Sequence, residues 1–150
     1  MKILVDADAC PVVSQAVELA KKYNIEIELF CDTNHVLTSD YARIHMIGAG
    51  RDAVDLALVN TCRANDVAVT QDYALAALIL AKGAYAINQN GFYYTEDNID
   101  GLLQKRWESA KARRAKSKNH LKGPKKRTKE DDENFVRALV ALLEKIGASM

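Results

Sequence analysis

MKILVDADACP, residues 1–11, contains the pattern from which the rest of the chain can be interpreted. The run Ile3 to Val5 is apolar and β-prone, as is typical of a strand covered on both faces in a parallel sheet. It ends at two acids, Asp6 and Asp8, and Pro11 then suits the first position of a helix because it has no N–H to lose there. We therefore expect a buried strand, an acidic turn and a helix over residues 11–23.

The two acids of this turn stand where chemistry usually happens in such folds. Ligands of open α/β sheets bind outside the carboxyl ends of the strands, and Asp6 and Asp8 are expected at such an end. An aspartate before a helix can also be a simple N-cap, which accepts a hydrogen bond from an unpaired N–H. Only one of the two can cap, and the other then carries a like charge close by. We interpret the pair as site residues, with capping as the alternative.

The composition predicts one globular domain over residues 1–150. Of 150 residues, 49% are hydrophobic, which suits a single domain with an ordinary core. No apolar stretch approaches the roughly 18 to 20 residues that a membrane span needs, and no signal-peptide pattern is present, so we expect a cytoplasmic protein without membrane contact. Three cysteines without a C-x-x-C pair argue against a disulfide framework or a structural zinc site.

The net charge of +1 conceals a basic arm at about residues 105–129. Twelve Lys or Arg and a single acid, Glu108, give the arm a charge of +11, so the rest of the chain carries −10. Lys and Arg that neutralise phosphates release counterions and supply most non-specific affinity for nucleic acid. A solvated segment is the alternative, but we favour a nucleic-acid partner. The expected contacts are Arg113, Arg114, Lys116, Lys118, Lys122, Lys125, Lys126 and Arg127.

The remaining pattern alternates strands with helices, which favours an α/β fold with a mainly parallel central sheet. We expect strands over 25–30, 42–47, 67–70 and 84–87, and helices over 52–62, 73–80, from 95 into the arm, and 132–146. In the strand 25–30, Glu26 and Glu28 alternate with apolar residues, so we expect it to be half-exposed and near a sheet edge.

Three later acids are expected near Asp6. Asp52 and Asp55 open one helix, and their spacing of three residues places both on one face. Asp55 shares its stripe with apolar residues and should point toward the sheet. Asp72 follows the strand 67–70 at the same end as Asp6, although it can also be an N-cap. Such a cluster of carboxylates needs a cation, and hard oxygen ligands suit Mg²⁺ or Mn²⁺.

Five motifs together resemble a known family, the YaiI/YqxD family of bacterial proteins. They are D-A-D-A-C-P at 6–11, G-x-D-x-x-D at 50–55, V-T-Q-D-x-x-L-A at 69–76, G-x-x-Y-T-x-x-N-I at 91–99, and the later Gly123-Pro124 with Phe135. That family is similar to the PIN-like superfamily of metal-dependent nucleases, and the resemblance implies a PIN-like three-layer sandwich. Asp6 would match the first-strand aspartate, Asp55 or Asp52 the acid on the middle helix, and Asp72 the aspartate of the T-x-D element.

We therefore expect a Mg²⁺- or Mn²⁺-dependent phosphodiesterase that acts on nucleic acid, RNA more than DNA. The expected catalytic residues are Asp6, Asp8, Asp55 and Asp72, and the expected metal ligands are Asp6, Asp52, Asp55 and Asp72. One alternative is a phosphatase that resembles the haloacid dehalogenases, with Asp6 as nucleophile and Asp8 as acid and base. Another is a non-catalytic RNA-binding protein, in which the acids are structural and the arm binds.

Overall fold

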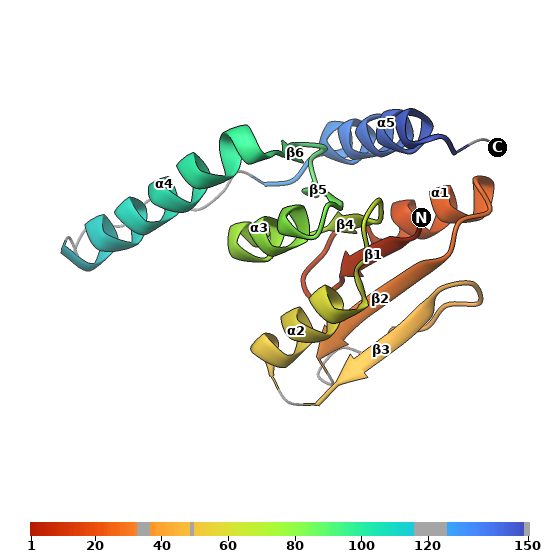
Figure 1. The fold of residues 1–150 in the computed structure, drawn as a ribbon, viewed down its shortest axis with the longest axis horizontal. Helices are drawn as coiled ribbons and strands as arrows, with labels where there is room; N and C mark the ends of the chain where they lie inside the picture. The colour runs from red at the N-terminus through yellow and green to blue at the C-terminus, as the bar shows by residue number, and fades with distance from the viewer. Residues whose placement is uncertain (33–36, 49, 116–125, 149–150) are drawn as a thin grey trace.

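The computed structural model describes residues 1–32, 37–48, 50–115 and 126–148, without the side chains of residues 110 and 112–115. Strands and helices alternate along most of the chain (Figure 1). In order they are β1 (Ile3–Asp6), α1 (Val13–Lys22), β2 (Ile27–Asp32), β3 (Arg43–Ile47), α2 (Arg51–Thr61), β4 (Val67–Val69), α3 (Tyr73–Ala81), β5 (Tyr85–Ile87), β6 (Tyr93–Tyr94), α4 (Glu96–Ala115) and α5 (Lys129–Ile146).

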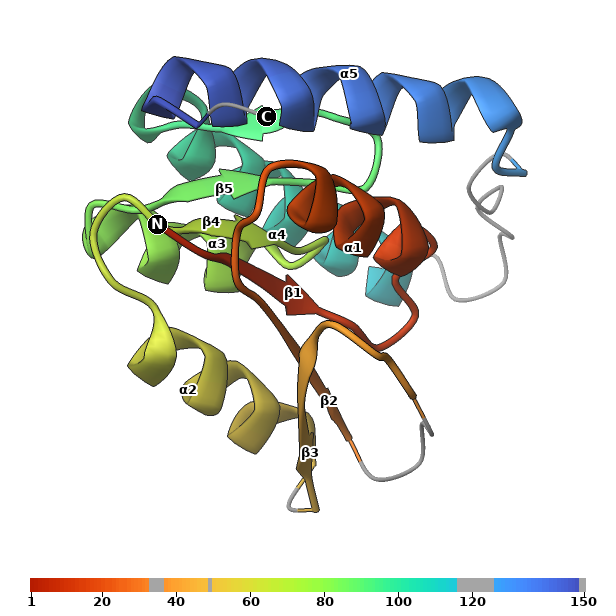
Figure 2. The ribbon, with the colours of Figure 1, turned by 90° about the vertical axis from the view of Figure 1, so that its right-hand side faces the viewer.

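The fold is a three-layer α/β sandwich around one six-stranded sheet, which confirms the fold class expected from the sequence. The strand order is β3-β2-β1-β4-β5-β6, and every neighbouring pair is parallel except β5 with β6. Helices α1 and α5 cover one face, and α2, α3 and the start of α4 cover the other (Figure 2). The far part of α4 extends away from the sheet (Figure 1).

Strand β1 lies at the centre because both of its faces are buried. Successive side chains of a strand point to opposite faces, so Ile3 and Val5 pack under α1 and α5 while Leu4 packs under α2 and α3. All three side chains have no exposed surface. The continuous apolar run at the start of the sequence therefore supplies both layers of the core.

The first helix begins later than the sequence predicts. Residues 7–10 form a turn in which the Cys10 N–H donates to the carbonyl of Ala7, and Ala9 has a left-handed φ of 57°. Pro11 and Val12 are still outside the helix, and α1 starts at Val13. The expectation that Pro11 occupies the first helical position is therefore wrong. Asp8 lies in this turn, close to the carboxyl end of β1.

Strand β2 is buried and not half-exposed as expected, but it does lie near the sheet edge. It is the second strand from the edge, and its Glu28 is 7% exposed. The carboxylate of Glu28 is balanced by His45 Nε2 at 2.7 Å and by Lys2 Nζ at 3.2 Å. The alternation of charged and apolar residues predicted an exposed face here, but paired charges allow this acid to be buried beside the edge strand β3.

Helix α5 docks onto the β5–β6 connection through close backbone contacts. Gly91 has φ +86°, and a Cβ at this position would lie 2.7 Å from the carbonyl oxygen of Asn134. The Tyr93 hydroxyl donates to the Ala138 carbonyl. A capping box of Thr128 and Asp131 starts the helix at Lys129. Among the described helices, none is long and apolar enough to cross a membrane.

Candidate active site

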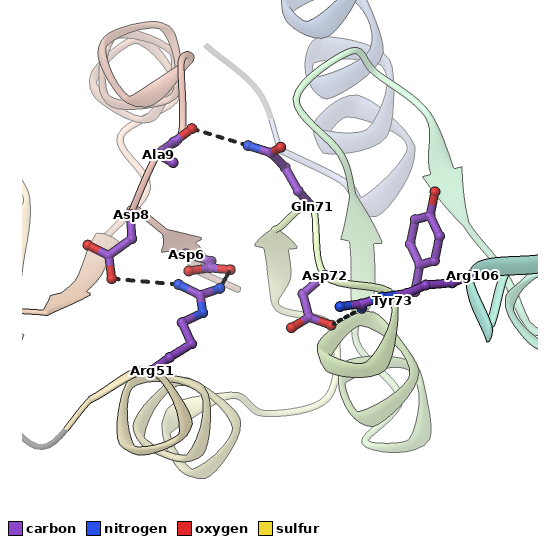
Figure 3. A pocket seen from close by; sticks show the side chains of 8 residues that line it. All are labelled: Asp6, Asp8, Ala9, Arg51, Gln71, Asp72, Tyr73 and Arg106. Atoms are coloured by element: carbon purple, nitrogen blue, oxygen red, sulfur yellow. Dashed lines mark hydrogen bonds and ion pairs between the residues drawn. The ribbon is translucent and has the colours of Figure 1, made fainter. Parts of the chain in front are cut away.

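The candidate site is a pocket at the carboxyl edge of the sheet, beside the point where the strand order reverses. From β1 the chain first builds outward to β2 and β3, and then returns to place β4 on the other side of β1. Open α/β sheets bind ligands at such a switch point. The pocket has a volume of about 420 Å³. Figure 3 shows the residues that line it, which are Asp6, Asp8, Ala9, Arg51, Gln71, Asp72, Tyr73 and Arg106.

Asp6 forms the floor of the pocket at the end of β1. It is 5% exposed, and its Oδ2 accepts hydrogen bonds from the Thr70 hydroxyl at 2.8 Å and from the Arg51 guanidinium. Thr70 is in turn fixed by the Tyr94 hydroxyl, which donates to the Thr70 carbonyl. The other oxygen, Oδ1, is buried and has no hydrogen-bond partner among the described residues. A buried carboxylate oxygen without a donor is costly, so a donor or a cation beside this atom would stabilise the folded state.

Arg51 lies among three carboxylates. It is the first residue of α2, and its Nη2 contacts Asp6 and lies 3.5 Å from Asp55 Oδ1, while Nη1 lies 3.6 Å from Asp8 Oδ2 (Figure 3 shows Asp6 and Asp8). Desolvation alone would lower the pKa of Arg51, but the hydrogen bond to Asp6 and the charges of all three acids raise it. The guanidinium therefore stays protonated and holds these acids around one centre.

Asp55, on the same helix as Arg51, and Asp8, in the turn after β1, complete this group. Burial raises the pKa of Asp55, and the charges of Asp6, Asp72 and Asp52 raise it further, whereas Arg51 opposes the shift. Asp55 Oδ1 is also buried without a hydrogen-bond partner among the described residues. Both oxygens of Asp8 accept from the backbone N–H of Asp32, at 3.0 and 3.2 Å, which fixes the carboxylate at the ends of β1 and β2.

Asp72 faces this group from across the pocket and also caps a helix. Its Oδ1 accepts from the backbone N–H groups of Ala74 and Leu75, so it is the N-cap of α3. The same oxygen lies 3.4 Å from Arg106 Nη1 of α4. The second oxygen points into the pocket (Figure 3). Asp72 is thus an N-cap, as the alternative weighed from the sequence held, and its second oxygen stays directed into the pocket.

The chemistry of the donor set fits a hard divalent cation, but the arrangement is closed by Arg51. Four carboxylates supply oxygen atoms of the kind that Mg²⁺ and Mn²⁺ prefer, and two buried oxygens lack hydrogen bonds. Among the described residues, no group of three or more His, Cys, Asp or Glu is arranged to hold a metal ion. The position between Asp6, Asp8 and Asp55 is taken by the guanidinium.

The structure brings most of the predicted acids together. Asp6, Asp8 and Asp72 line the pocket, and Asp55 borders it through Arg51. Asp52 is exposed in the first turn of α2 and does not line the pocket. Asp52 lies only about 60° around the helix axis from Asp55, yet it is exposed whereas Asp55 is half-buried, so the three-residue spacing did not bring both acids to the site.

The predicted nucleic-acid contacts lie mostly beyond what the structure describes. Lys116, Lys118, Lys122 and Lys125 fall outside the described residues, and the side chains of Arg113 and Arg114 are also outside them. Lys126 is exposed. Arg127 is engaged inside the protein, since it donates to Asp132, to Asn90 and to the carbonyl of Gln89. Its guanidinium therefore holds the start of α5 against the β5–β6 turn.

Sequence reasoning missed three residues that organise the pocket, namely Arg51, Thr70 and Arg106. The spacing of Arg51 and Asp55, four residues apart on one helix, was a detectable signal for an ion pair. Thr70 follows β4 directly and precedes Asp72 by two residues, a position from which its hydroxyl reaches the N–H of Asp72 at 3.0 Å. Arg106 gave no local signal, because α4 reaches the pocket only through its packing on α3.

Comparisons with known proteins identify relatives over nearly the whole chain. A family model described as "Uncharacterized BCR, YaiI/YqxD family" matches residues 4–145. A UPF0178 protein of Clostridium acetobutylicum is 59% identical over 143 residues, which cover 95% of this chain and 97% of the relative. UPF0178 proteins of Alkaliphilus oremlandii and Clostridium tetani are 49% and 45% identical, over 96% and 97% of this chain and 92% and 98% of the relatives. None of the solved structures compared with the chain matches it.

Proposed function

We propose that this chain, which belongs to the YaiI/YqxD family, hydrolyses phosphodiester bonds in nucleic acid with the help of a bound Mg²⁺ or Mn²⁺. The expected substrate is RNA more than DNA. The observation that carries the proposal is the convergence of Asp6, Asp8, Asp55 and Asp72 on one pocket, with a buried oxygen of Asp6 and one of Asp55 left without hydrogen bonds. The resemblance to PIN-like nucleases points to the same chemistry.

The four acids would divide the work of holding the cation. Asp6 Oδ1 and Asp55 Oδ1 are the buried oxygens that lack donors, and the free-facing oxygen of Asp72 closes the group from the opposite wall. Asp8 would complete the set, whereas the exposed Asp52 is left out of it. When bound, the cation would activate water and stabilise the negative charge on the scissile phosphate.

Two arginines and the basic arm support a polyanionic substrate. Arg51 and Arg106 stand on opposite sides of the pocket, and guanidinium groups recognise phosphate oxygens in pairs. Helix α4 carries Arg106 into the pocket and continues into the basic arm. A strand bound along the arm through its phosphates would therefore be delivered to the acids, which alone would repel it.

The contacts of Asp6 do not favour the phosphatase alternative. An attacking carboxylate must reach phosphorus, but Asp6 is 5% exposed and its Oδ2 is already bonded to Thr70 and Arg51. Both oxygens of Asp8 accept the backbone N–H of Asp32, so this carboxylate is held as a hydrogen-bond acceptor at the ends of β1 and β2. A binding protein without catalysis remains the second outcome of the experiments below.

Hydrolysis of short fluorescent RNA and DNA strands with Mn²⁺, with Mg²⁺ and with chelator tests the activity directly. We expect cation-dependent cleavage that Asp6→Asn reduces by two orders of magnitude or more. Asp52→Asn is the matched control, because it removes the same charge three residues from Asp55 and should leave cleavage nearly unchanged. Retained RNA binding with no cation-dependent cleavage in the parent protein would instead identify a binding protein.

Thermal unfolding tests the cation without any substrate. A cation at ten times its Kd should stabilise the folded state by about 1.4 kcal/mol, because it binds only that state. For a chain of this size, such a gain corresponds to a rise in Tm of about 3–6 °C. Asp72→Asn should reduce the rise. If millimolar Mg²⁺ and Mn²⁺ leave the Tm of the parent unchanged, the acids are not a metal site.

A further inference from the structure

Arg51 stands where the helix it begins does not favour a cation. The N-terminus of a helix carries a partial positive charge and disfavours cations. Arg51 is nevertheless the first residue of α2, after the N-cap Gly50. Its side chain is directed into the pocket and contacts Asp6 and Asp8 (Figure 3). The acids, and not the helix, therefore determine where this guanidinium lies.

One guanidinium satisfies these acids only in part. Asp6, Asp8 and Asp55 are three acids around one guanidinium, and only the contact to Asp6 is a hydrogen bond among those described for Arg51. The side chain of Asp6, a residue of the pocket lining, is more than nine-tenths buried, yet its Oδ1 has no hydrogen-bond partner among the described residues. The group thus has room, in charge and in unpaired oxygens, for a cation of higher charge.

We propose that Arg51 is a displaceable resident cation, which occupies the place of the divalent ion among Asp6, Asp8 and Asp55 and leaves it to contact the phosphate of the substrate. The inference rests on the proposed function and adds a role for a residue outside the metal-binding set. The side chain of Arg51 is 41% exposed, so it can leave the acids without disturbing the core. Displacement also removes the obstacle that keeps the three carboxylates from surrounding one ion.

The pocket gives the displaced side chain a place to go. Arg51 and Arg106 are both in the pocket lining, from α2 and α4, with Asp72 paired to Arg106. A phosphate entering between them would meet two guanidinium groups, and a guanidinium binds two phosphate oxygens at once. The divalent cation and the phosphodiester should therefore bind cooperatively. Each raises the affinity for the other by the same factor, because the coupling is reciprocal.

Calorimetric titration with Mn²⁺ alone tests the competition. We expect Arg51→Gln to bind Mn²⁺ at least tenfold more tightly than the parent, because no guanidinium then competes for the carboxylates. Arg51→Lys keeps the charge and guards against a misfolded Gln variant, and it should fall between the two. Arg137→Gln is the matched control, since Arg137 is exposed on α5 and its removal changes the net charge equally. Its Mn²⁺ affinity should equal that of the parent.

Titration in the presence of a dinucleoside monophosphate, which carries one phosphodiester, tests the second half. The dinucleotide should raise the Mn²⁺ affinity of the parent severalfold and leave that of Arg51→Gln nearly unchanged. Equal Mn²⁺ affinity in the parent and in both folded Arg51 variants would overturn the inference while the metal site stands. Equal coupling in parent and Arg51→Gln would overturn the phosphate role. Absence of Mn²⁺ binding in every variant would overturn the proposed function and, with it, this inference.

Discussion

Replacement of Thr70 by Val should destabilise the protein by about 2–4 kcal/mol. Thr70 is 2% exposed, its hydroxyl donates to Asp6 Oδ2 at 2.8 Å, and it accepts the Asp72 N–H at 3.0 Å. Valine has nearly the same shape, so the buried apolar surface barely changes. A hydrogen bond to a charged group contributes about 1.5–3 kcal/mol, and a buried donor left unpaired costs about 1–3 kcal/mol more, with partial overlap between the two.

Urea unfolding at neutral pH, with the slope of the transition unchanged, measures this difference. Thr70→Ser keeps the hydroxyl and should lose only about 1 kcal/mol, through its missing methyl group. Thr61→Val is the matched control for the loss of a threonine hydroxyl. The Thr61 hydroxyl bonds to the Ala57 carbonyl within α2, and its removal should cost less than about 0.5 kcal/mol. A Thr70→Val protein as stable as Thr70→Ser would refute the role assigned to this hydroxyl.

Three further predictions concern other parts of the chain. Desolvation alone would raise the pKa of Glu28, but its hydrogen bonds to His45 and Lys2 hold that pKa below the ordinary value of 4.5. The stability that this group contributes is therefore present above about pH 4.5 and is lost as the pH falls toward the folded-state pKa. When the free energy of unfolding is measured across the acid range, Glu28→Gln should make that loss smaller. Gly91→Ala should lower the free energy of unfolding in urea by about 2–4 kcal/mol, because the backbone there has a positive φ and the new Cβ would meet the α5 backbone. Gly101→Ala in α4 is the contrasting case. No atom lies within 4 Å of its new Cβ, so this change should raise the free energy of unfolding by about 0.5–1 kcal/mol. In binding titrations, the logarithm of the nucleic-acid affinity should fall against the logarithm of the salt concentration with a slope near −4, for roughly five phosphate contacts. Charge reversal of four arm residues should make this slope shallower; they are Arg113, Arg114, Lys125 and Lys126.

The sequence determined the central sheet and most of the acids because both depend on local pattern. A continuous apolar and β-prone run is typical of a strand buried on both faces, and β1 is that strand. Acids that follow parallel strands must meet at one edge, which placed Asp6 and Asp72 together. Helical periodicity was sufficient to direct Asp55 inward, but the same argument placed Asp52 on that face, and Asp52 is exposed.

The features that sequence reasoning missed depend on contacts between distant elements. Glu28 looked solvent-facing because its partners, Lys2 and His45, come from other parts of the chain. Pro11 fits a first helical position, but the turn at residues 7–10 decides where the helix starts. Arg51 was visible beside acids in the sequence, yet the sequence alone does not tell which carboxylates lie around it.

The placement of α5 has a consequence for the order in which the protein can fold during synthesis. Phe135, Leu139 and Leu143 of α5 have no exposed surface, and they complete the core layer that also contains α1. More than one hundred residues separate the two helices in the chain. On the ribosome, the face of the sheet under α2 and α3 can therefore close while α1 still exposes apolar surface. That surface remains open to chaperones, or to aggregation, until the last helix emerges.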